Sequence, residues 1–432
     1  MPNVMKNSGF QWIGDIPQNW EMRRVKWCFC QKKEKAGIED PTVLSLARDG
    51  IKVRDISTNE GQLAADYTNY NPVEPGDLLL NPMDLYSGDN CNISKISGVI
   101  SPAYVNLKTI NGNIPEFYNY YFKTQYWTMA FFTHGKGVSF ENRWTLTNET
   151  LRNYPVVLPN PIQQKKIADY LDDKCGKIDQ AIEGQKKIIE KLKEYKQSVI
   201  TEAVTKGLDP NVPMKDSGIE WIGLIPKHWE VRKVKTLTKI ISKGTTPTTV
   251  GRDTVKDGPV KFIKAENIQN NQIQNEPHIA IDEETNEILK RSQLKLNDIL
   301  FVIAGATIGK VAIIDNPQIL PANTNQAVSF LRLNNPNLSK YLWYYLQSNY
   351  IKEKLHVLSV QSAQPNLSMQ DLGNFCIPIP ELTEQHCIIT HLSTQCAKID
   401  LAIQKKEETI EKLAEYKKSL IYECVTGKRE VI

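Results

Sequence analysis

Two long stretches of the chain carry apolar residues at helical spacing. Residues 162–205 and 383–425 contain almost no glycine or proline and are rich in Lys, Glu, Ile and Leu. Their apolar positions recur about every seven residues, and further isoleucines widen the stripe, which is typical of an amphipathic helix with an imperfect heptad. The positions of this predicted stripe are Ile178, Ile182, Ile189, Leu192, Tyr195 and Val199 in the first stretch, and Ile399, Ile403, Ile410, Leu413, Tyr416 and Leu420 in the second.

Each predicted helix is too polar for complete burial and too apolar to stand alone, so it needs a partner. We expect the two helices to pair with each other as an antiparallel coiled coil. At 1.5 Å per residue such a pair is roughly 60 Å long. Two alternatives remain open: each helix packs on the globular part of its own copy, or it pairs with another molecule.

Outside the helices the pattern changes to short apolar runs broken by Gly, Pro, Asn and Asp. Runs such as GDLLL at 76–80 and NDILFVI at 297–303 indicate strands with turns between them. An aromatic-rich segment follows at 115–132, and a similar one at 338–355, and both indicate helices. The same order of elements is therefore expected twice along the chain.

Repeated sequence frames these two occurrences. KNSGFQWIGDIPQNWEMRRVK at 6–26 and KDSGIEWIGLIPKHWEVRKVK at 215–235 are identical at 13 of 21 positions. Segments 177–207 and 398–428 are identical at 17 of 31 positions. A repeat of this length indicates one structural unit that is used twice.

The predicted fold class is α+β, with two mixed α/β domains joined by two long helices and an internal pseudo-two-fold repeat. We place the domains at 1–158 and 208–379 and the helical segments at 159–207 and 380–432. Two copies of one frame around two different bodies suit a protein that meets two different but equivalently placed targets.

Amino-acid composition excludes only a few classes of protein. A net charge of +4 over 432 residues permits a nucleic-acid partner without requiring one. The chain has no run of about 18 apolar residues and no signal-peptide pattern, so we expect neither membrane insertion nor export. The eight cysteines form no CxxC pair, which favours reduced thiols and a cytoplasmic location.

Two short motifs resemble catalytic signatures, but each lacks residues that the signature requires. GATIGK at 305–310 has one residue too few for a phosphate-binding loop, and Val311 stands where a Ser or Thr would hold Mg²⁺. NPMD at 81–84 lacks the second proline and the aromatic residue of an amino-methyltransferase motif, and no glycine-rich cofactor loop precedes it. We therefore expect no catalytic residues and no cofactor in this chain.

A cluster of His386, Cys387, His391 and Cys396 lies on the second predicted helix, where it could in principle hold a metal ion. Only the cysteine recurs in the first copy, as Cys175. A helix face with a buried cysteine is the better interpretation, so no metal site is predicted.

Cationic, hydroxyl and amide side chains recur in loops of both domains. Such groups bind phosphate oxygens, and arginine and amide side chains also match base edges in the DNA major groove. Each alone suits an ordinary solvated loop, but together they predict a surface that binds a polyanion. The candidates are Arg48, Lys52, Arg54, Lys136, Ser139 and Arg143 in the first domain, and Lys243, Thr245, Thr246, Thr248, Arg252, Lys264, Asn267, Gln361, Gln364 and Asn366 in the second.

The pattern resembles the DNA-specificity subunit of Type I restriction–modification systems, over nearly the whole chain. The most family-like strings are KGTTPTT, NDILFVIAGATIGKVAII and IPIPELTEQ in the second copy, the last followed by the long helix. The first copy departs from the family pattern, because it reads LPNPIQQ at 158–164 and its opening KKEKAGIED lacks the glycine–threonine–proline loop.

This resemblance implies a non-catalytic subunit with two target-recognition domains, each of which reads one half of a bipartite, asymmetric double-stranded DNA sequence. It implies that the helices form an antiparallel coiled coil that spaces the half-sites. It also implies two modification methyltransferase subunits and restriction subunits as partners in the prokaryotic cytoplasm. S-adenosylmethionine, ATP and Mg²⁺ would be bound by those partners.

Two other functions remain open from the sequence. The chain could be a nucleic-acid methyltransferase with its own recognition domains, although the cofactor loop and catalytic motif are missing. It could also be a non-catalytic coiled-coil adaptor without a role on DNA.

Overall fold

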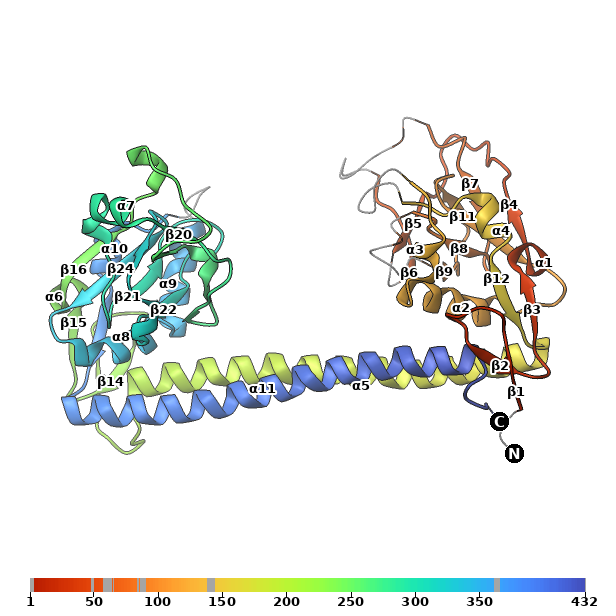
Figure 1. The fold of residues 1–432 in the computed structure, drawn as a ribbon. Coiled ribbons are helices and arrows are strands. Elements are labelled where there is room, and N and C mark those ends of the chain that lie inside the picture. The colour runs from red at the N-terminus through yellow and green to blue at the C-terminus, as the bar shows by residue number, and fades with distance from the viewer. Residues whose placement is uncertain are drawn as a thin grey trace. The chain divides into compact units, whose positions relative to one another are not determined.

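The computed structural model describes residues 4–47, 50–56, 64, 66–83, 85, 91–137, 144–360 and 366–431. The chain forms two compact units (Figure 1). Unit 1 comprises residues 1–185 and 407–432, and unit 2 comprises residues 186–406. The divisions fall inside two long helices, α5 (Pro161–Lys206) and α11 (Leu382–Val425), so each helix contributes to both units.

Unit 1 is built around a four-stranded antiparallel sheet with the order β4-β11-β8-β9. Smaller pairs, β1-β2, β3-β12, β5-β6 and β7-β10, surround it. The elements of its globular part are β1 (Met5–Asn7), β2 (Asp15–Pro17), β3 (Glu21–Arg24), α1 (Val25–Cys28), β4 (Phe29–Lys32), β5 (Leu44–Ala47), β6 (Gly50–Val53), β7 (Asn71–Val73), β8 (Leu78–Leu80), β9 (Cys91–Ile93), β10 (Gly98–Ile100), β11 (Val105–Thr109), α2 (Pro115–Trp127), α3 (Ala130–Thr133), α4 (Asn148–Arg152) and β12 (Pro155–Leu158).

Unit 2 repeats this plan with the order β16-β24-β21-β22. A three-stranded sheet, β20-β17-β23, and a short hairpin, β18-β19, are added to it. The elements of its globular part are β13 (Met214–Asp216), β14 (Leu224–Pro226), β15 (Glu230–Lys233), α6 (Val234–Leu237), β16 (Thr238–Lys243), η1 (Pro247–Val250), β17 (Val260–Ile263), η2 (Ala265–Asn267), β18 (Ile268–Gln269), β19 (Gln272–Ile273), β20 (Ala280–Ile281), α7 (Glu283–Ile288), η3 (Lys290–Ser292), β21 (Ile299–Val302), β22 (Val311–Ile313), η4 (Pro317–Ile319), β23 (Ala322–Thr324), β24 (Val328–Leu333), η5 (Pro336–Leu338), α8 (Ser339–Tyr345), α9 (Asn349–Val360), α10 (Met369–Gly373) and β25 (Cys376–Ile379).

The core of each unit is shared between the globular part and segments of both long helices. In unit 1, Leu78 and Tyr121 belong to the same buried cluster as Leu171 of α5 and Leu420 of α11. In unit 2, α5 and α11 likewise contribute to the cluster that contains Phe301. Because burial of apolar area is the main stabilising term, each helix segment is held both by its globular part and by the other helix.

Within each unit the two helix segments run in opposite directions. In unit 1, Lys417 of α11 binds Asp179 of α5 at 2.7 Å, and Cys424 lies near Cys175. In unit 2, Lys196 of α5 binds Asp400 of α11 at 2.7 Å. The repeat aligns Lys196 with Lys417 and Asp179 with Asp400, so one ion pair is formed twice.

Two residues of the predicted apolar stripe are exposed. The prediction that they pack between the helices is wrong. Tyr195 is 58% and Tyr416 is 49% exposed. The half-buried positions are instead the lysines that follow each tyrosine, Lys196 and Lys417. A straight helix drifts by about 20° per heptad against a strict seven-residue repeat, so the inward-facing positions move off the heptad along the helix.

Each predicted aromatic helix is interrupted. In unit 1, α2 ends at Trp127, and Met129 adopts a left-handed conformation with φ of 59° before α3 begins. In unit 2 the corresponding segment is divided into α8 and α9. Among the described residues, none of the helices combines the length and the hydropathy that crossing a bilayer requires.

The two copies of the opening motif pack on the ends of the long helices. Trp20 lies beside Gly427 after α11 in unit 1, and Trp229 lies beside Gly207 after α5 in unit 2. Both glycines have positive φ, 73° and 77°, as helix-terminating glycines commonly do. A Cβ on Gly427 would lie 2.3 Å from Cδ of Pro17, so this position has no room for a side chain.

Candidate nucleic-acid interface

The loops at one end of the four-stranded sheet form a candidate interface in each unit. Strands β4 and β8 end where their antiparallel neighbour β11 begins, since Asn106 pairs with Lys32 and Val105 with Leu80. In unit 2, β16 and β21 end where β24 begins. Segments far apart in the sequence therefore meet at equivalent places in the two units.

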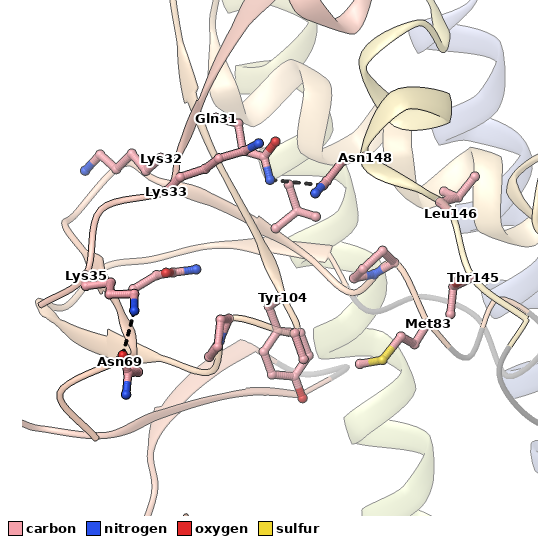
Figure 2. A pocket seen from close by; sticks show the side chains of 15 residues that line it. Gln31, Lys32, Lys33, Lys35, Asn69, Met83, Tyr104, Thr145, Leu146 and Asn148 are labelled. Atoms are coloured by element: carbon pink, nitrogen blue, oxygen red, sulfur yellow. Dashed lines mark hydrogen bonds between the residues drawn. The ribbon is translucent and has the colours of Figure 1, made fainter. Parts of the chain in front are cut away.

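In unit 1 these segments enclose a hollow of about 650 Å³, seen from close by in Figure 2. Lysines and amides lie around it, and Tyr104 and Met83 contribute apolar surface. None of the lining residues, all of them in the described part of the chain, is acidic. They are Gln31, Lys32, Lys33, Lys35, Asn69, Asn71, Pro82, Met83, Pro102, Ala103, Tyr104, Val105, Thr145, Leu146 and Asn148.

The lysines of the hollow differ in how firmly they are held. Lys32 Nζ lies 2.8 Å from Oδ2 of the buried Asp77 and 2.6 Å from Oε2 of Glu74. Burial opposes the charged form of Lys32, but the hydrogen bonds to Asp77 and Glu74 outweigh it and raise the pKa of this lysine. Its charge is thus matched inside the protein.

Lys33 and Lys35 are exposed at the edge of the hollow. Lys35 donates a hydrogen bond to Oδ1 of Asn69 at 2.8 Å, and Gln31 donates one to Oδ1 of Asn148 at 3.2 Å (Figure 2). Exposed ammonium groups bind phosphates, and amides match base edges. The hollow therefore has the chemistry to hold a nucleic-acid strand and to contact its bases.

In unit 2 the equivalent loop lies close against the segment that leads into β24. The N–H of Gly244 donates to the carbonyl of Val328, and the N–H of Thr245 donates to that of Thr324. A Cβ on Gly244 would lie 1.8 Å from the carbonyl oxygen of Thr324, so only glycine fits. Lys243 and Thr248 on either side are exposed.

A family model for the "Type I restriction modification DNA specificity domain" matches residues 97–200 and 226–412, together more than half of the chain. The chain belongs to this specificity-domain family. Its fold also resembles that of solved structures. One, from work on complex assembly and conformational transition of the type I R-M system, superposes with a TM-score of 0.71 at 14% identity, covering 96% of this chain and 99% of the other. The HsdS subunit from Thermoanaerobacter tengcongensis gives a TM-score of 0.51 at 14% identity, covering 96% and 98%.

Curated relatives of this specificity domain align over most of the chain. The MjaVIII specificity subunit of Methanocaldococcus jannaschii is 26% identical, and the alignment covers 96% of this chain and 94% of the relative. The EcoBI specificity subunit of Escherichia coli is 24% identical over 90% of this chain and 80% of the relative.

Several residues that the sequence predicts to contact DNA lie at these sheet ends. The backbone of Lys136 bonds with that of Thr145, which lines the hollow, and Lys136 is exposed. In unit 2, Asn366 holds the position equivalent to Thr145, bridges to Ala304 and is exposed. Thr245 and Thr246 are half-buried in the loop that lies on β24.

Other residues predicted to contact DNA form hydrogen bonds or ion pairs within the protein. Asn267 is 4% exposed, accepts from the N–H of Lys264 at 3.0 Å and donates to the carbonyl of Pro277 at 2.9 Å, so its amide holds a turn. Lys264 itself is half-buried there. Arg252 forms an ion pair with Glu284. These findings argue against Asn267 as a base-reading residue, and Arg252 would have to exchange partners to bind DNA.

The remaining predicted residues of both units lie elsewhere or outside the described part of the chain. Lys52 is on β6 and Arg54 follows it, in the hairpin beside β9. Arg48, Ser139, Arg143, Gln361 and Gln364 lie outside the described residues. Among the described residues, no group of side chains is placed to hold a metal ion, and this includes the cluster of His386, Cys387, His391 and Cys396.

The sequence reasoning missed Lys33, Lys35, Asn69, Met83 and Tyr104. A signal existed for the first two, because the run KKEK begins at the last residue of β4, as KGTTP begins at the last residue of β16. Asn69 and Tyr104 carried no such signal, since they reach the hollow only through long-range strand pairing.

Proposed function

We propose that the chain is the DNA-specificity subunit of a Type I restriction–modification complex. Each unit would read one half of a bipartite, asymmetric double-stranded DNA target through the loops at the end of its four-stranded sheet. The chain would perform no chemistry itself. Family membership and relatives named as specificity subunits support this proposal.

One observation carries the proposal: the same strand order presents different chemistry in the two units. The end of the sheet in unit 1 has a hollow edged by exposed lysines and amides. The same end in unit 2 has a compact glycine–threonine loop. A constant frame with two different loop sets fits two half-sites of different sequence, since base edges are read by side chains of different type.

The helices would form an antiparallel coiled coil that fixes the distance between the half-sites. The opposed direction of the segments within each unit and the twice-formed Lys–Asp ion pair support this role. On this proposal, a few residues inserted into either helix change the permitted spacer and leave both half-site sequences unchanged.

We also propose that two modification methyltransferase subunits and restriction subunits assemble on the chain in the prokaryotic cytoplasm. S-adenosylmethionine would be bound by the methyltransferases, and ATP and Mg²⁺ by the restriction subunits. Two copies of one partner require two equivalent surfaces, which an internal repeat supplies.

Mapping methylated adenines tests the proposal. The chain would be expressed with its modification subunits, and the map compared with that of a chimera whose residues 215–379 come from a relative. One half-site should change and the other stay. Methylation of DNA by the purified chain alone would instead favour a methyltransferase with its own recognition domains.

A salt titration separates the proposal from a coiled-coil adaptor. Binding that neutralises several phosphates weakens steeply as salt rises, with a slope of about −0.9 per phosphate in a double-logarithmic plot. An adaptor without a role on DNA would show no measurable binding at low salt.

A further inference from the structure

A pair of amide side chains joins two elements at the wall of the hollow in unit 1. Gln31 lies on β4 and Asn148 is the first residue of α4, and both line the hollow (Figure 2). Nε2 of Gln31 donates a hydrogen bond to Oδ1 of Asn148 at 3.2 Å. Gln31 is half-buried and Asn148 is exposed. The pair therefore stands at the boundary between the sheet and the hollow.

The same two positions in unit 2 carry apolar side chains. Counted along the paired strands, Ile241 of β16 has the position that Gln31 has on β4. Met369, the first residue of α10, has the position that Asn148 has in α4. Ile241 packs against the core of unit 2, and Met369 is 37% exposed. The pair of positions is thus amide in one unit and apolar in the other.

The elements that carry these positions are otherwise alike. Helices α4 and α10 each have five residues, and each is preceded by a hydroxyl residue, Thr147 or Ser368, whose side chain accepts from the backbone N–H three residues on. Each helix buries a leucine at the same position, Leu151 or Leu372. The frame therefore forms with either kind of pair, so its stability does not account for the amides in unit 1.

The hydrogen bond within the pair leaves one edge of the Gln31 amide unpaired. Within the described part of the chain, Oε1 of Gln31 accepts no hydrogen bond, and the second N–H of Nε2 donates none. An acceptor beside a donor matches N6 and N7 of adenine in the major groove. Guanine presents two acceptors there, O6 and N7, so Oε1 would face another oxygen atom. Because Asn148 holds Nε2, the amide cannot turn over without losing that bond.

The rest of the hollow suits the remainder of an A·T base pair and its backbone. Met83 and Tyr104 are half-buried and lie on the other side of the hollow from the amide pair (Figure 2). They offer apolar surface to the methyl group that thymine presents in the major groove. The exposed Lys33 and Lys35 at the edge have the charge to bind phosphates.

We propose that Gln31 reads an adenine in the half-site of unit 1 and that Asn148 is the positioning residue that fixes its amide. Oε1 of Gln31 would accept from N6–H of the adenine, and Nε2 would donate to N7. This inference rests on the proposed function, in which unit 1 reads one half-site of a double-stranded DNA target.

Transferring the residues of unit 2 into unit 1 tests the inference in the assembled complex. The chain would be expressed with its modification subunits, either as the original or with Gln31→Ile and Asn148→Met together, and the methylated sites would be mapped. Unit 2 folds with this apolar pair, so the double variant should fold. At one adenine position, distinct from the methylated base, discrimination should fall by about five- to hundredfold. The other half-site should stay unchanged.

Thr147→Ser is the matched control. Thr147 adjoins Asn148, does not line the hollow, and as serine keeps a capping hydroxyl like that of Ser368. This variant should give the original map. If the double variant also gives the original map at every position, the inference is overturned and the proposed function stands. If the original complex yields no two-part motif, the proposed function fails and the inference fails with it.

Modified duplexes separate reading from positioning. The mapped position would carry adenine, guanine or 7-deazaadenine, which lacks the N7 acceptor, and binding of the complex would be measured. The original should bind 7-deazaadenine about two- to tenfold more weakly than adenine, and Gln31→Leu should abolish this difference. Asn148→Leu frees the amide and should narrow the preference for adenine over guanine, whereas Asn148→Asp keeps an oxygen acceptor and should preserve it.

Two results of these binding measurements would overturn the assignment. One is equal binding of adenine and 7-deazaadenine by the original complex. The other is an unchanged preference for adenine over guanine in Asn148→Leu. Each comparison is a ratio within one protein, and the first uses the original complex alone, so it decides the matter even where a variant fails to fold.

Discussion

The sheet ends of the two units share a frame and differ in how one loop meets its neighbour. In unit 1 the chain leaves β4 as a run of lysines and encloses a hollow with the segment before β11. In unit 2 it leaves β16 through Gly244, which lets the backbone lie directly on the segment before β24. The absence of a side chain at Gly244 thus permits a close backbone approach in unit 2.

A second contrast lies beneath these loops. The repeat aligns Asp77 with Asp298, and both aspartates are buried. Asp77 binds Lys32 of β4, whereas Asp298 binds Arg332 of β24 at 2.6 Å. The buried aspartate is therefore the same in both units, whereas the cationic residue that binds it lies on a different strand in each. In unit 1 this arrangement holds one lysine of the hollow and leaves Lys33 and Lys35 exposed.

The largest expected effect comes from removing these aspartates. Asp298→Ala leaves Arg332 partly buried without its carboxylate and should lower the free energy of unfolding of unit 2 by about 3–5 kcal/mol. Asp77→Ala should cost less, about 2 kcal/mol, because Lys32 keeps Glu74 at 2.6 Å. Urea unfolding followed by hydrogen exchange in each unit measures both. If both substitutions lowered the free energy of unfolding equally, the two buried aspartates would not differ in how their cations are held.

Gly244→Ala should destabilise unit 2 by about 2–3 kcal/mol, because its Cβ would overlap the carbonyl of Thr324. The control is Gly184→Ala in α5, where a Cβ meets no atom within 4 Å and the helix should gain about 1 kcal/mol. Thermal unfolding compares the two. If both substitutions raise the melting temperature, the loop does not need the close approach that distinguishes unit 2.

Replacing Lys33 and Lys35 by alanine should weaken DNA binding about tenfold at moderate salt and lower the salt slope by about 2. The expected cause is the loss of two phosphate contacts at the hollow. Lys177→Ala, which breaks only an exposed ion pair with Asp173 on α5, serves as the control and should leave the slope unchanged. A double variant with the original slope would place the DNA away from the hollow.

The smallest effect concerns pH. The N–H of Thr285 donates to Asp282 at the start of α7 and lowers the pKa of this carboxyl. A lowered pKa in the folded state gives stability that is present above the ordinary carboxyl pKa and is lost as pH falls through the folded value. Asp282→Asn keeps a capping side chain and should flatten the acid side of the unfolding profile of unit 2 slightly. An unchanged profile would show that Asp282 does not contribute there.

Periodicity and repetition made the helices and the doubled plan of the sheets predictable. The spacing of apolar residues indicated α5 and α11, although the exposed Tyr195 and Tyr416 show that a strict heptad overstates the regularity of the stripe. The order of strands in the sheets repeats because the sequence that frames them repeats.

The candidate interface was predictable only in part. Residue type pointed to Lys243 and Asn366, and both are exposed at the sheet end of unit 2. Residue type also pointed to Asn267, whose amide turns inward to hold a turn. Which polar side chain faces outward depends on strand register and on local hydrogen bonds, and neither is visible in residue type alone. Tyr104 reaches the hollow for the same reason: its neighbour Val105 pairs with Leu80.

The most direct test of the central claim is a methylation map for a complex in which only the loop at one sheet end is altered. Thr245, Thr246 and Thr248 of unit 2 would be replaced by alanine, with the frame and the other unit unchanged. The account predicts relaxed sequence preference in one half-site, with the second half-site and the spacer length as before. A map in which both half-sites change, or neither does, would contradict the claim that each unit reads its own half of the target.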